Sequence, residues 1–223
     1  MPGLLQEVRI GYLAPMAHHN LEMPISDAQV RALRAGDTVT LQRTLFGIRD
    51  ATQIAMFDRG RSTAFDMRGH AVVHTAPNVR KVPVSDAYPA GYEALCVGTT
   101  TSSRMERFSA PLLSQYGVRL IVGKGGMQQG SLAAFAEFGG AYLAVVGGAA
   151  ALQTSWINAI EAVDMDDLNP ESLWRFRIRD FGPLLVGMDS HGRSLYNTVN
   201  DEVAQRRAAV LAKLGVKGMT SGP

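Results

Sequence analysis

GTTTSSRM at residues 98–105 and GKGGM at residues 123–127 each follow a short apolar run of the chain. The two runs, Ala94–Val97 and Val118–Val122, predict buried strands. Each predicted strand is followed by glycines and small hydroxylated residues, and then by a segment that leads toward a helix. In an open α/β sheet, ligands bind in the crevice outside the carboxyl ends of the strands. We therefore expect the two loops to lie side by side and to form the functional centre of the chain.

The side chains of these loops suit a small, multiply charged anion. Arg104 offers a planar guanidinium that matches a carboxylate, and Lys124 adds a compact positive charge. Backbone N–H groups at the start of a helix also stabilise anions, and the glycines around Lys124 let a ligand approach the backbone closely. A purely structural interpretation stays open, because hydroxylated residues before helices are commonly N-caps and paired glycines are commonly turns.

Composition limits the classes of protein that fit. The chain has 223 residues, of which 46% are hydrophobic and 19% charged, and its net charge of +2 gives no basic field for nucleic acid. The one cysteine, Cys96, excludes an intramolecular disulfide, and the chain alone cannot supply the thiolates of a cluster site. No apolar run approaches the ~20 residues of a membrane span, and Met1–His19 lacks the pattern of a secretory signal. We expect a cytoplasmic protein that binds neither nucleic acid nor membranes.

The rest of the chain predicts strands that alternate with helices. Apolar and alternating runs predict further strands at Asp37–Ile48 (or a hairpin there), Ala71–Ala76, Ala141–Val146, Ile160–Val163 and Trp174–Arg179, with Leu184–Met188 paired to the last of these or near it. Caps and helical spacing predict helices at Val30–Arg34 after a capping box at Ser26, and at Ala51–Asp58, Ser109–Gly117, Ser131–Phe138 and Asp201–Leu214. This order predicts an α/β fold with a mixed sheet.

Four further expectations concern smaller features. His18–Asn20 and Asn78–Gly91 predict loops, and Val8–Leu13 predicts a short edge strand. Cys96 is expected to be a small buried residue of its strand. The closing helix is expected to turn one apolar face inward, formed by Val203, Ala204, Ala208, Val210 and Leu211. Gly218–Pro223 is expected to fray.

Nucleotide binding is a weaker alternative for the glycine-rich loops. The segment from Gly117 to Gly125 is one residue longer than a phosphate loop, and it has glycine where that loop needs serine or threonine. Gly147–Gly148 follows a strand, but the Gly-x-Gly-x-x-Gly fingerprint of dinucleotide-binding proteins is absent. Both segments therefore predict tight turns between a strand and a helix.

The order of the motifs resembles one known family. The motifs are Arg49-Asp50-Ala51, Gly98–Met105, Gly123–Met127, Gly147–Leu152, Asp180–Pro183 and Asp189–Gly192. Over residues 22–197 this ordered set resembles the β subunit of the class I, iron–sulfur-dependent hydro-lyases, the fumarase and L(+)-tartrate dehydratase group. In single-chain members of that family the same unit is the C-terminal domain.

The resemblance implies a fold, a cofactor and a partner. It implies a single domain of the swivelling β/β/α type over residues 22–216, with residues 1–21 as an N-terminal extension and 217–223 as the tail. It implies a [4Fe-4S] cluster held by three cysteines of a partner α subunit, in an α2β2 assembly or around a dimer of this chain, and no metal held by this chain itself. It implies that the substrate, a small dicarboxylate, is bound by Arg49, Thr100, Thr101, Arg104, Lys124 and Gly125, with Thr100, Arg104 and Lys124 as catalytic residues.

Two positions depart from the pattern of that family. Thr99 stands where the family commonly has proline, which alters the stiffness of the loop. Gln53 stands where the family commonly has histidine, four residues after Arg49. Glutamine cannot titrate, so any acid, base or charge role of that histidine is lost. These departures leave the identity of the dicarboxylate open.

Two functions of different classes follow. The first is a hydro-lyase subunit that reversibly hydrates or dehydrates a dicarboxylate of the fumarate/malate or tartrate type, in which the arginines and the lysine stabilise negative charge. The second is a stand-alone α/β module that binds a small anion without catalysis. A neighbouring reading frame with three well-separated cysteines would favour the first.

Overall fold

Five neighbouring strands run parallel and bring their carboxyl ends to one edge of a sheet. A computed structural model, which describes residues 16–215, places them in the order β1 (His18–Glu22), β2 (Thr38–Ile48), β3 (Ala71–His74), β6 (Leu120–Gly123) and β7 (Ala141–Ala144). The loops that follow β2, β3, β6 and β7 therefore meet at the same edge.

The long strand β9 (Leu173–Met188) closes most of these strands into a barrel. It pairs antiparallel with β7, and it also pairs antiparallel with β2 from Thr38 opposite Leu185 to Gly47 opposite Trp174. The strands β2, β3, β6, β7 and β9 thus form a closed circuit, and β8 (Ile157–Asp164) pairs with β9 outside it. Register shifts along β9 let its 16 residues curve around the barrel.

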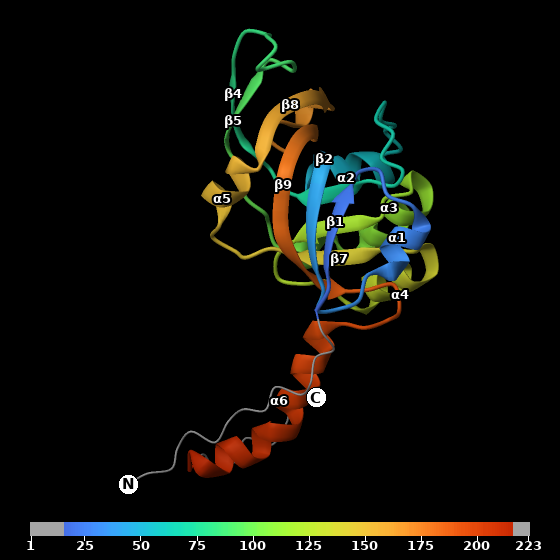
Figure 1. The fold of residues 1–223 in the computed structure, drawn as a ribbon, viewed down its shortest axis with the longest axis vertical. Coiled ribbons are helices and arrows are strands. Elements are labelled where there is room, and N and C mark those ends of the chain that lie inside the picture. The colour runs from blue at the N-terminus through green and yellow to red at the C-terminus, as the bar shows by residue number, and fades with distance from the viewer. Residues whose placement is uncertain (1–15, 216–223) are drawn as a thin grey trace.

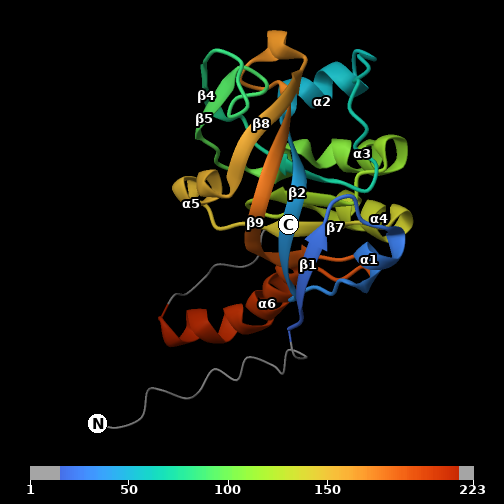
Figure 2. The same ribbon diagram turned by 45° about the horizontal axis from the view of Figure 1, so that its top comes forward.

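Helices cover the two sides of the barrel unevenly. One side carries the helices α1 (Asp27–Ala32), α2 (Asp50–Phe57), α3 (Ser109–Tyr116) and α4 (Gln129–Phe138), as Figure 1 shows. The other side carries α5 (Ala150–Ser155) and a hairpin of β4 (Asn78–Lys81) and β5 (Tyr92–Cys96) (Figure 2). No helix within residues 16–215 is long and apolar enough to cross a bilayer.

Strands β3, β6 and β7 are buried on both faces, which explains why their sequences are continuous apolar runs rather than alternating ones. In β3, Val72 belongs to the cluster that the helices cover, with Leu112 of α3 and Phe135 of α4. The adjacent Val73 belongs to the other cluster, with Phe176 of β9. The same alternation between two buried clusters continues in β6 and β7.

The expectation of a buried strand at Ala94–Val97 is wrong in its placement. The segment forms β5, which pairs with β4 in a two-stranded sheet apart from the barrel, so Asn78–Gly91 is not simply a loop. Leu95 is 46% exposed and Cys96 is also exposed, which contradicts the expected burial of that cysteine. A short apolar run predicts a strand but does not say which sheet it joins, and a two-stranded hairpin covers few side chains.

The two ends of the barrel also differ from expectation. His18–Asn20 is not a loop but the start of β1, which pairs in parallel with β2 from His18 opposite Thr38 onward. Leu184–Met188 does not form a separate partner of Trp174–Arg179, because both lie in the single strand β9. Val8–Leu13 lies outside the described residues.

The closing helix does not turn its apolar face toward the barrel. Helix α6 (Leu195–Lys213) begins earlier than expected and contains no buried residue, and Val203 is 58% exposed. Figure 1 shows α6 leaving the body of the molecule. Helical spacing of apolar residues indicates that one face is apolar, but it does not identify what covers that face. Gly218–Pro223 lies outside the described residues.

The other expected elements are confirmed. The Ser26 side chain accepts a hydrogen bond from the Gln29 N–H and the Gln29 side chain accepts one from the Ser26 N–H, which completes the capping box of α1. Gly117 ends α3, and Gly139 ends α4. The segment at Asp37–Ile48 is one strand, β2, rather than a hairpin.

Candidate functional site

Three separate stretches of sequence meet at the carboxyl edge of the parallel strands. Arg49 directly follows β2, and Lys124 directly follows β6. The loop of residues 98–105 crosses the ends of the strands between them: the Thr100 N–H donates to the His74 carbonyl over 2.8 Å, and the Ser102 N–H donates to the Lys124 carbonyl over 2.9 Å. The expected juxtaposition of the two loops is thus present, although β5 itself lies outside the barrel.

Arg104 and Arg49 share a carboxylate at this edge. The Arg104 guanidinium donates to the Thr100 hydroxyl over 3.0 Å and lies 3.2 Å from Asp50 Oδ2. The Arg49 Nε lies 3.3 Å from the same Asp50 oxygen and 3.4 Å from Glu171 Oε1. The Arg104 side chain is 50% exposed, so its guanidinium can exchange Asp50 for an incoming carboxylate at small cost.

Lys124 differs from the two arginines of this edge because its charge is not paired with a carboxylate of the described residues. No ion pair within residues 16–215 involves its ammonium group, and the side chain is half-buried. The turn after it is tight: Gly125 has φ +80°, and a Cβ there would lie 3.2 Å from the Thr101 methyl group. Thr101 and Lys124 are themselves joined by a parallel bridge. The lysine is therefore held beside the hydroxylated loop, with Thr101 and Gly125 as its neighbours.

Helix α5 supports the hydroxylated loop from behind, and sequence reasoning missed this contact. The Gln153 amide oxygen accepts from the Thr99 N–H over 3.1 Å, and the Thr154 hydroxyl accepts from the Val97 N–H over 2.8 Å. Gly147–Gly148 is the turn that leads from β7 toward this helix. A glutamine in a short helix gives no sequence signal for such a role, because its partner is a backbone group distant in the chain.

The structure corrects the expected source of anion-binding N–H groups. The N–H groups of Thr99, Thr100 and Ser102 all donate to protein acceptors. The segment that follows is a 3-10 helix, Ser102–Phe108, rather than the start of an α-helix. The side chains of Arg49, Arg104 and Lys124 therefore carry the positive character of the edge.

A neutral histidine lies directly beneath the loop. His74 is 1% exposed, and burial lowers its pKa from 6.5 to about 4, while the charge of Asp50 opposes that shift. Its Nδ1 lies 2.9 Å from the Ser102 hydroxyl oxygen. Gln53, the residue that replaces the histidine common in the resembled family, is fully buried, and neither atom of its amide has a hydrogen-bond partner within the described residues.

The burial of His74 predicts a loss of stability in acid. The unfolded chain binds a proton at this group near pH 6.5 while the folded chain resists until about 4, so the free energy of unfolding falls as the pH is lowered through that window. One pKa unit is worth about 1.4 kcal/mol, so the shift contributes about 3 kcal/mol at most. Urea unfolding at pH 7 and pH 4.5 should show a smaller drop for His74→Asn than for the wild type. Equal drops in the two proteins would contradict this assignment.

The residues present do not suit a metal cluster. No group of three or more metal-ligating His, Cys, Asp or Glu side chains occurs within residues 16–215. Cys96 is exposed on β5 rather than at the edge of the barrel. His19 bonds to Asp37 and His18 bonds to Thr38, so the paired histidines engage different partners. The cations and hydroxyls at the edge suit carboxylates rather than iron, and the two carboxylates there, Asp50 and Glu171, already pair with the arginines.

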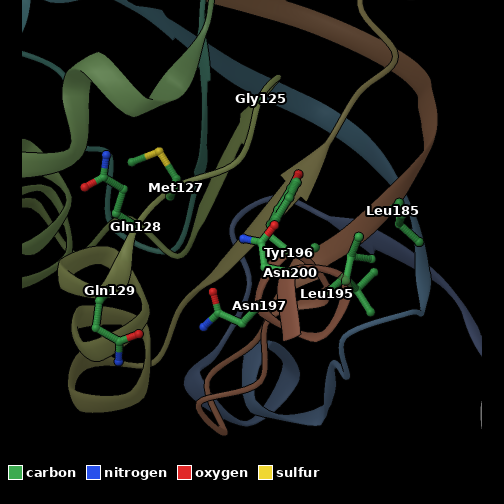
Figure 3. A pocket seen from close by; sticks show the side chains of 11 residues that line it. Gly125, Met127, Gln128, Gln129, Leu185, Leu195, Tyr196, Asn197 and Asn200 are labelled. Atoms are coloured by element: carbon green, nitrogen blue, oxygen red, sulfur yellow. The ribbon is translucent and has the colours of Figure 1, made fainter. Parts of the chain in front are cut away.

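A cavity of about 660 Å³ lies beside the Lys124 loop. Figure 3 shows that it is bordered by Gly125 and Met127 on one side, and by Leu185 of β9 and Tyr196 of α6 on the other. Of the residues expected to bind substrate, this cavity includes Gly125. It therefore adjoins the edge that carries Arg49, Arg104 and Lys124, and Gly125 is common to both.

Comparison with known proteins gives a consistent assignment. Residues 7–199 match the model of a protein family described as Fumarase C-terminus. The L(+)-tartrate dehydratase subunit beta of Escherichia coli (strain K12) is 34% identical over 195 residues, which cover 87% of this chain and 94% of that protein. A Geobacillus stearothermophilus protein named "Putative fumarate hydratase class I" is 35% identical over 180 residues, which cover 80% of this chain and 34% of that protein. The chain therefore spans nearly all of the first relative and about a third of the second.

Proposed function

The chain belongs to the Fumarase C-terminus family, and on that basis we propose that it is the β subunit of a hydro-lyase acting on a small dicarboxylate. The reaction is the reversible addition of water to an unsaturated dicarboxylate, of the fumarate/malate or tartrate type. The observation that carries this proposal is the meeting of Arg49, Arg104 and Lys124 at one edge of the barrel, with Lys124 free of any ion pair within residues 16–215.

The cations of the edge bind the two carboxylates of the substrate. Arg104 presents two parallel N–H donors to one carboxylate, and Thr100, 3.0 Å from its Nη2, fixes the orientation of the guanidinium. Arg49 and Lys124 approach the substrate from β2 and β6. Loss of a proton from the carbon next to a carboxylate moves negative charge onto that carboxylate, and a cation already in position stabilises this charge without reorganisation.

Thr100 and Thr101 contribute hydroxyl groups to the same site. The Thr100 hydroxyl accepts from Arg104, so its own proton can be donated to a substrate oxygen. A hydroxyl is a weak base near neutral pH and needs a neighbouring activator to remove a proton. We therefore assign Thr100 to binding and orientation, and place the proton acceptor on the partner side of the site.

A partner subunit completes the site in this proposal. The β subunit name of the Escherichia coli relative implies an α partner, and this chain's described residues do not suit the [4Fe-4S] cluster of the family. We propose that the α subunit holds the cluster and covers the charged edge in an α2β2 assembly or around a dimer of this chain, in the cytoplasm. The proposal also takes the domain as residues 22–216 with the swivelling β/β/α arrangement.

The substrate panel of the assembled enzyme tests this proposal. The chain would be produced together with a three-cysteine partner, purified without oxygen and assayed with fumarate, mesaconate and tartrate. Turnover of at least one of these dicarboxylates is expected. A monocarboxylate such as crotonate should not be hydrated, since it leaves the cations that bind the second carboxylate unpaired. Saturable dicarboxylate binding without turnover would support the anion-binding module instead.

Replacing Cys96 with serine should leave the iron content of the assembled enzyme unchanged. The thiol is exposed on β5 and belongs to no metal-ligating group within residues 16–215. Because the site is at the surface, the stability should change by less than about 0.5 kcal/mol. Iron and sulfide analysis of the purified complex gives the measurement. A drop in iron per complex would show that Cys96 is a ligand.

A further inference from the structure

We propose that a buried hydrogen-bonded chain through Tyr142, Ser102 and His74 sets the spacing between the Arg104 loop and the Lys124 loop. The inference rests on the proposed function, because it explains how the two halves of the dicarboxylate site are held at a fixed distance. None of the three side chains is expected to touch substrate, so they act as positioning residues.

The contacts connect four elements of the edge. Tyr142 of β7 donates from its hydroxyl to the Ser102 hydroxyl oxygen over 3.2 Å, and Ser102 lies 2.9 Å from His74 Nδ1 on β3. The Ser102 N–H donates to the Lys124 carbonyl over 2.9 Å. Ser102 therefore joins the hydroxylated loop to β3 and β7 through its side chain and to the Lys124 loop through its backbone.

Close packing makes this junction intolerant of movement. The Ser102 hydroxyl occupies the space above Gly123, where a Cβ would overlap it. Ser102, His74 and Tyr142 are each at most 1% exposed, so water cannot replace a lost partner. The Nε2 of His74 already has no hydrogen-bond partner within the described residues. Loss of the Ser102 hydroxyl would leave Nδ1 without a partner as well, at a cost of about 1–3 kcal/mol that favours displacement of the loop.

The protonation states of Tyr142 and His74 agree with hydrogen bonds that are donated from Tyr142 to Ser102 and from Ser102 to His74. The Tyr142 hydroxyl keeps its proton because burial raises its pKa, against the lowering effect of Ser102 and of the Gly126 N–H. His74 is neutral because burial lowers its pKa to about 4, and Asp50 is the charged group that opposes this shift. Tyr142 can therefore donate to Ser102, and Ser102 can donate to Nδ1 in the tautomer of His74 that carries its proton on Nε2.

The consequence for function is geometric. Thr100 and Arg104 stand on one side of Ser102, and Lys124 is bonded to its backbone. If the hydrogen bonds among Tyr142, Ser102 and His74 are broken, the two sets of carboxylate-binding groups can shift relative to each other. A displacement of about 1 Å between binding groups can cost about 10²-fold in rate.

Hydrogen–deuterium exchange of the full-length chain tests the coupling directly, without requiring activity. Ser102→Ala and Tyr142→Phe should each raise exchange in residues 98–105 and in residues 123–127 together. The matched controls are Thr63→Val, which removes a hydroxyl bonded to Asp164 over 2.6 Å, and Tyr92→Phe, whose hydroxyl bonds to Asp166 over 2.7 Å. The controls remove the same groups elsewhere and should leave both loops unchanged.

Kinetics of the assembled enzyme give the second readout. Ser102→Ala should lower kcat/KM by about 10–100-fold, with a rise in KM for the dicarboxylate, while Thr63→Val stays within threefold of the wild type. The Asn side chain can present an acceptor near the position of Nδ1, so His74→Asn should retain more activity than His74→Leu, which has none. A general packing role predicts the opposite order, because Leu fills the buried volume better.

The two readouts separate the two claims. Raised exchange in only one loop, or equal effects of Ser102→Ala and Thr63→Val, would overturn the positioning chain whatever the substrate is. Absence of dicarboxylate turnover by the wild-type assembly would overturn the proposed function, and the exchange data would still decide the coupling of the loops.

Discussion

Replacing Lys124 with alanine is expected to lower kcat/KM of the assembled enzyme by about 10²–10³-fold. Loss of one buried charge-assisted contact to a developing anion costs about 3–4 kcal/mol in the transition state. Lys124 is the cation of the edge with no ion pair within residues 16–215, so its removal leaves no internal carboxylate unpaired. The fold should survive, since the residue follows β6 rather than lying within it.

Lys81→Ala provides the matched control for this variant. Lys81 lies at the end of β4 with its side chain 76% exposed, and its nearest carboxylate, Asp166, is 3.9 Å away. The control removes the same charge from the same chain and should leave kcat/KM within threefold. The measurement is steady-state kinetics with the preferred dicarboxylate. A loss of less than threefold in kcat/KM for Lys124→Ala in an intact assembly would rule out contact between Lys124 and the substrate.

Replacing Arg104 with lysine should lower kcat/KM by about 10–100-fold. This loss corresponds to one hydrogen bond to a charged group, which contributes about 1.5–3 kcal/mol. Lysine keeps the charge but loses the planar pair of donors that matches a carboxylate. It also loses the fixed orientation that the Thr100 hydroxyl gives to the guanidinium. Because the Arg104 side chain is 50% exposed, the substitution should have little effect on folding.

Arg107→Lys is the corresponding control. Arg107 lies in the same 3-10 helix and pairs with Asp58 over 2.6 Å, away from the charged edge. Both variants change the same chemical group in the same element. Near-full activity of Arg104→Lys, measured beside this control, would contradict the bidentate contact with a carboxylate.

The sequence predicted the charged edge for a reason that is local. Arg49 and Lys124 each stand directly after an apolar strand, and parallel strands bring such positions to one edge. The sequence did not predict that the Asp50 carboxylate lies between the two arginines. Asp50 is next to Arg49 in the chain, but Arg104 belongs to a different loop, and no local pattern shows that the two loops meet there. Sequence reasoning also missed Gln153, whose partner is a backbone group 54 residues away.

The fold was predicted where burial alone decides the structure and missed where pairing decides it. The runs that became β3, β6 and β7 are buried on both faces, so their apolar character is continuous. The run that became β5 has the same character, yet it pairs with β4 outside the barrel. Closure of the barrel depends on β9 pairing with both β2 and β7, a long-range arrangement that no local pattern encodes.

Titration of one subunit with the other tests most directly the central claim that this chain supplies half of an active site. The chain, purified alone and free of metal, and the cluster-bearing partner, purified alone without oxygen, would each be assayed with fumarate and tartrate, and then mixed in increasing ratio. The account predicts no turnover by either subunit alone and an activity that rises until one copy of this chain is present per copy of the partner. Robust turnover by this chain without partner or iron, or by the partner without this chain, would contradict it.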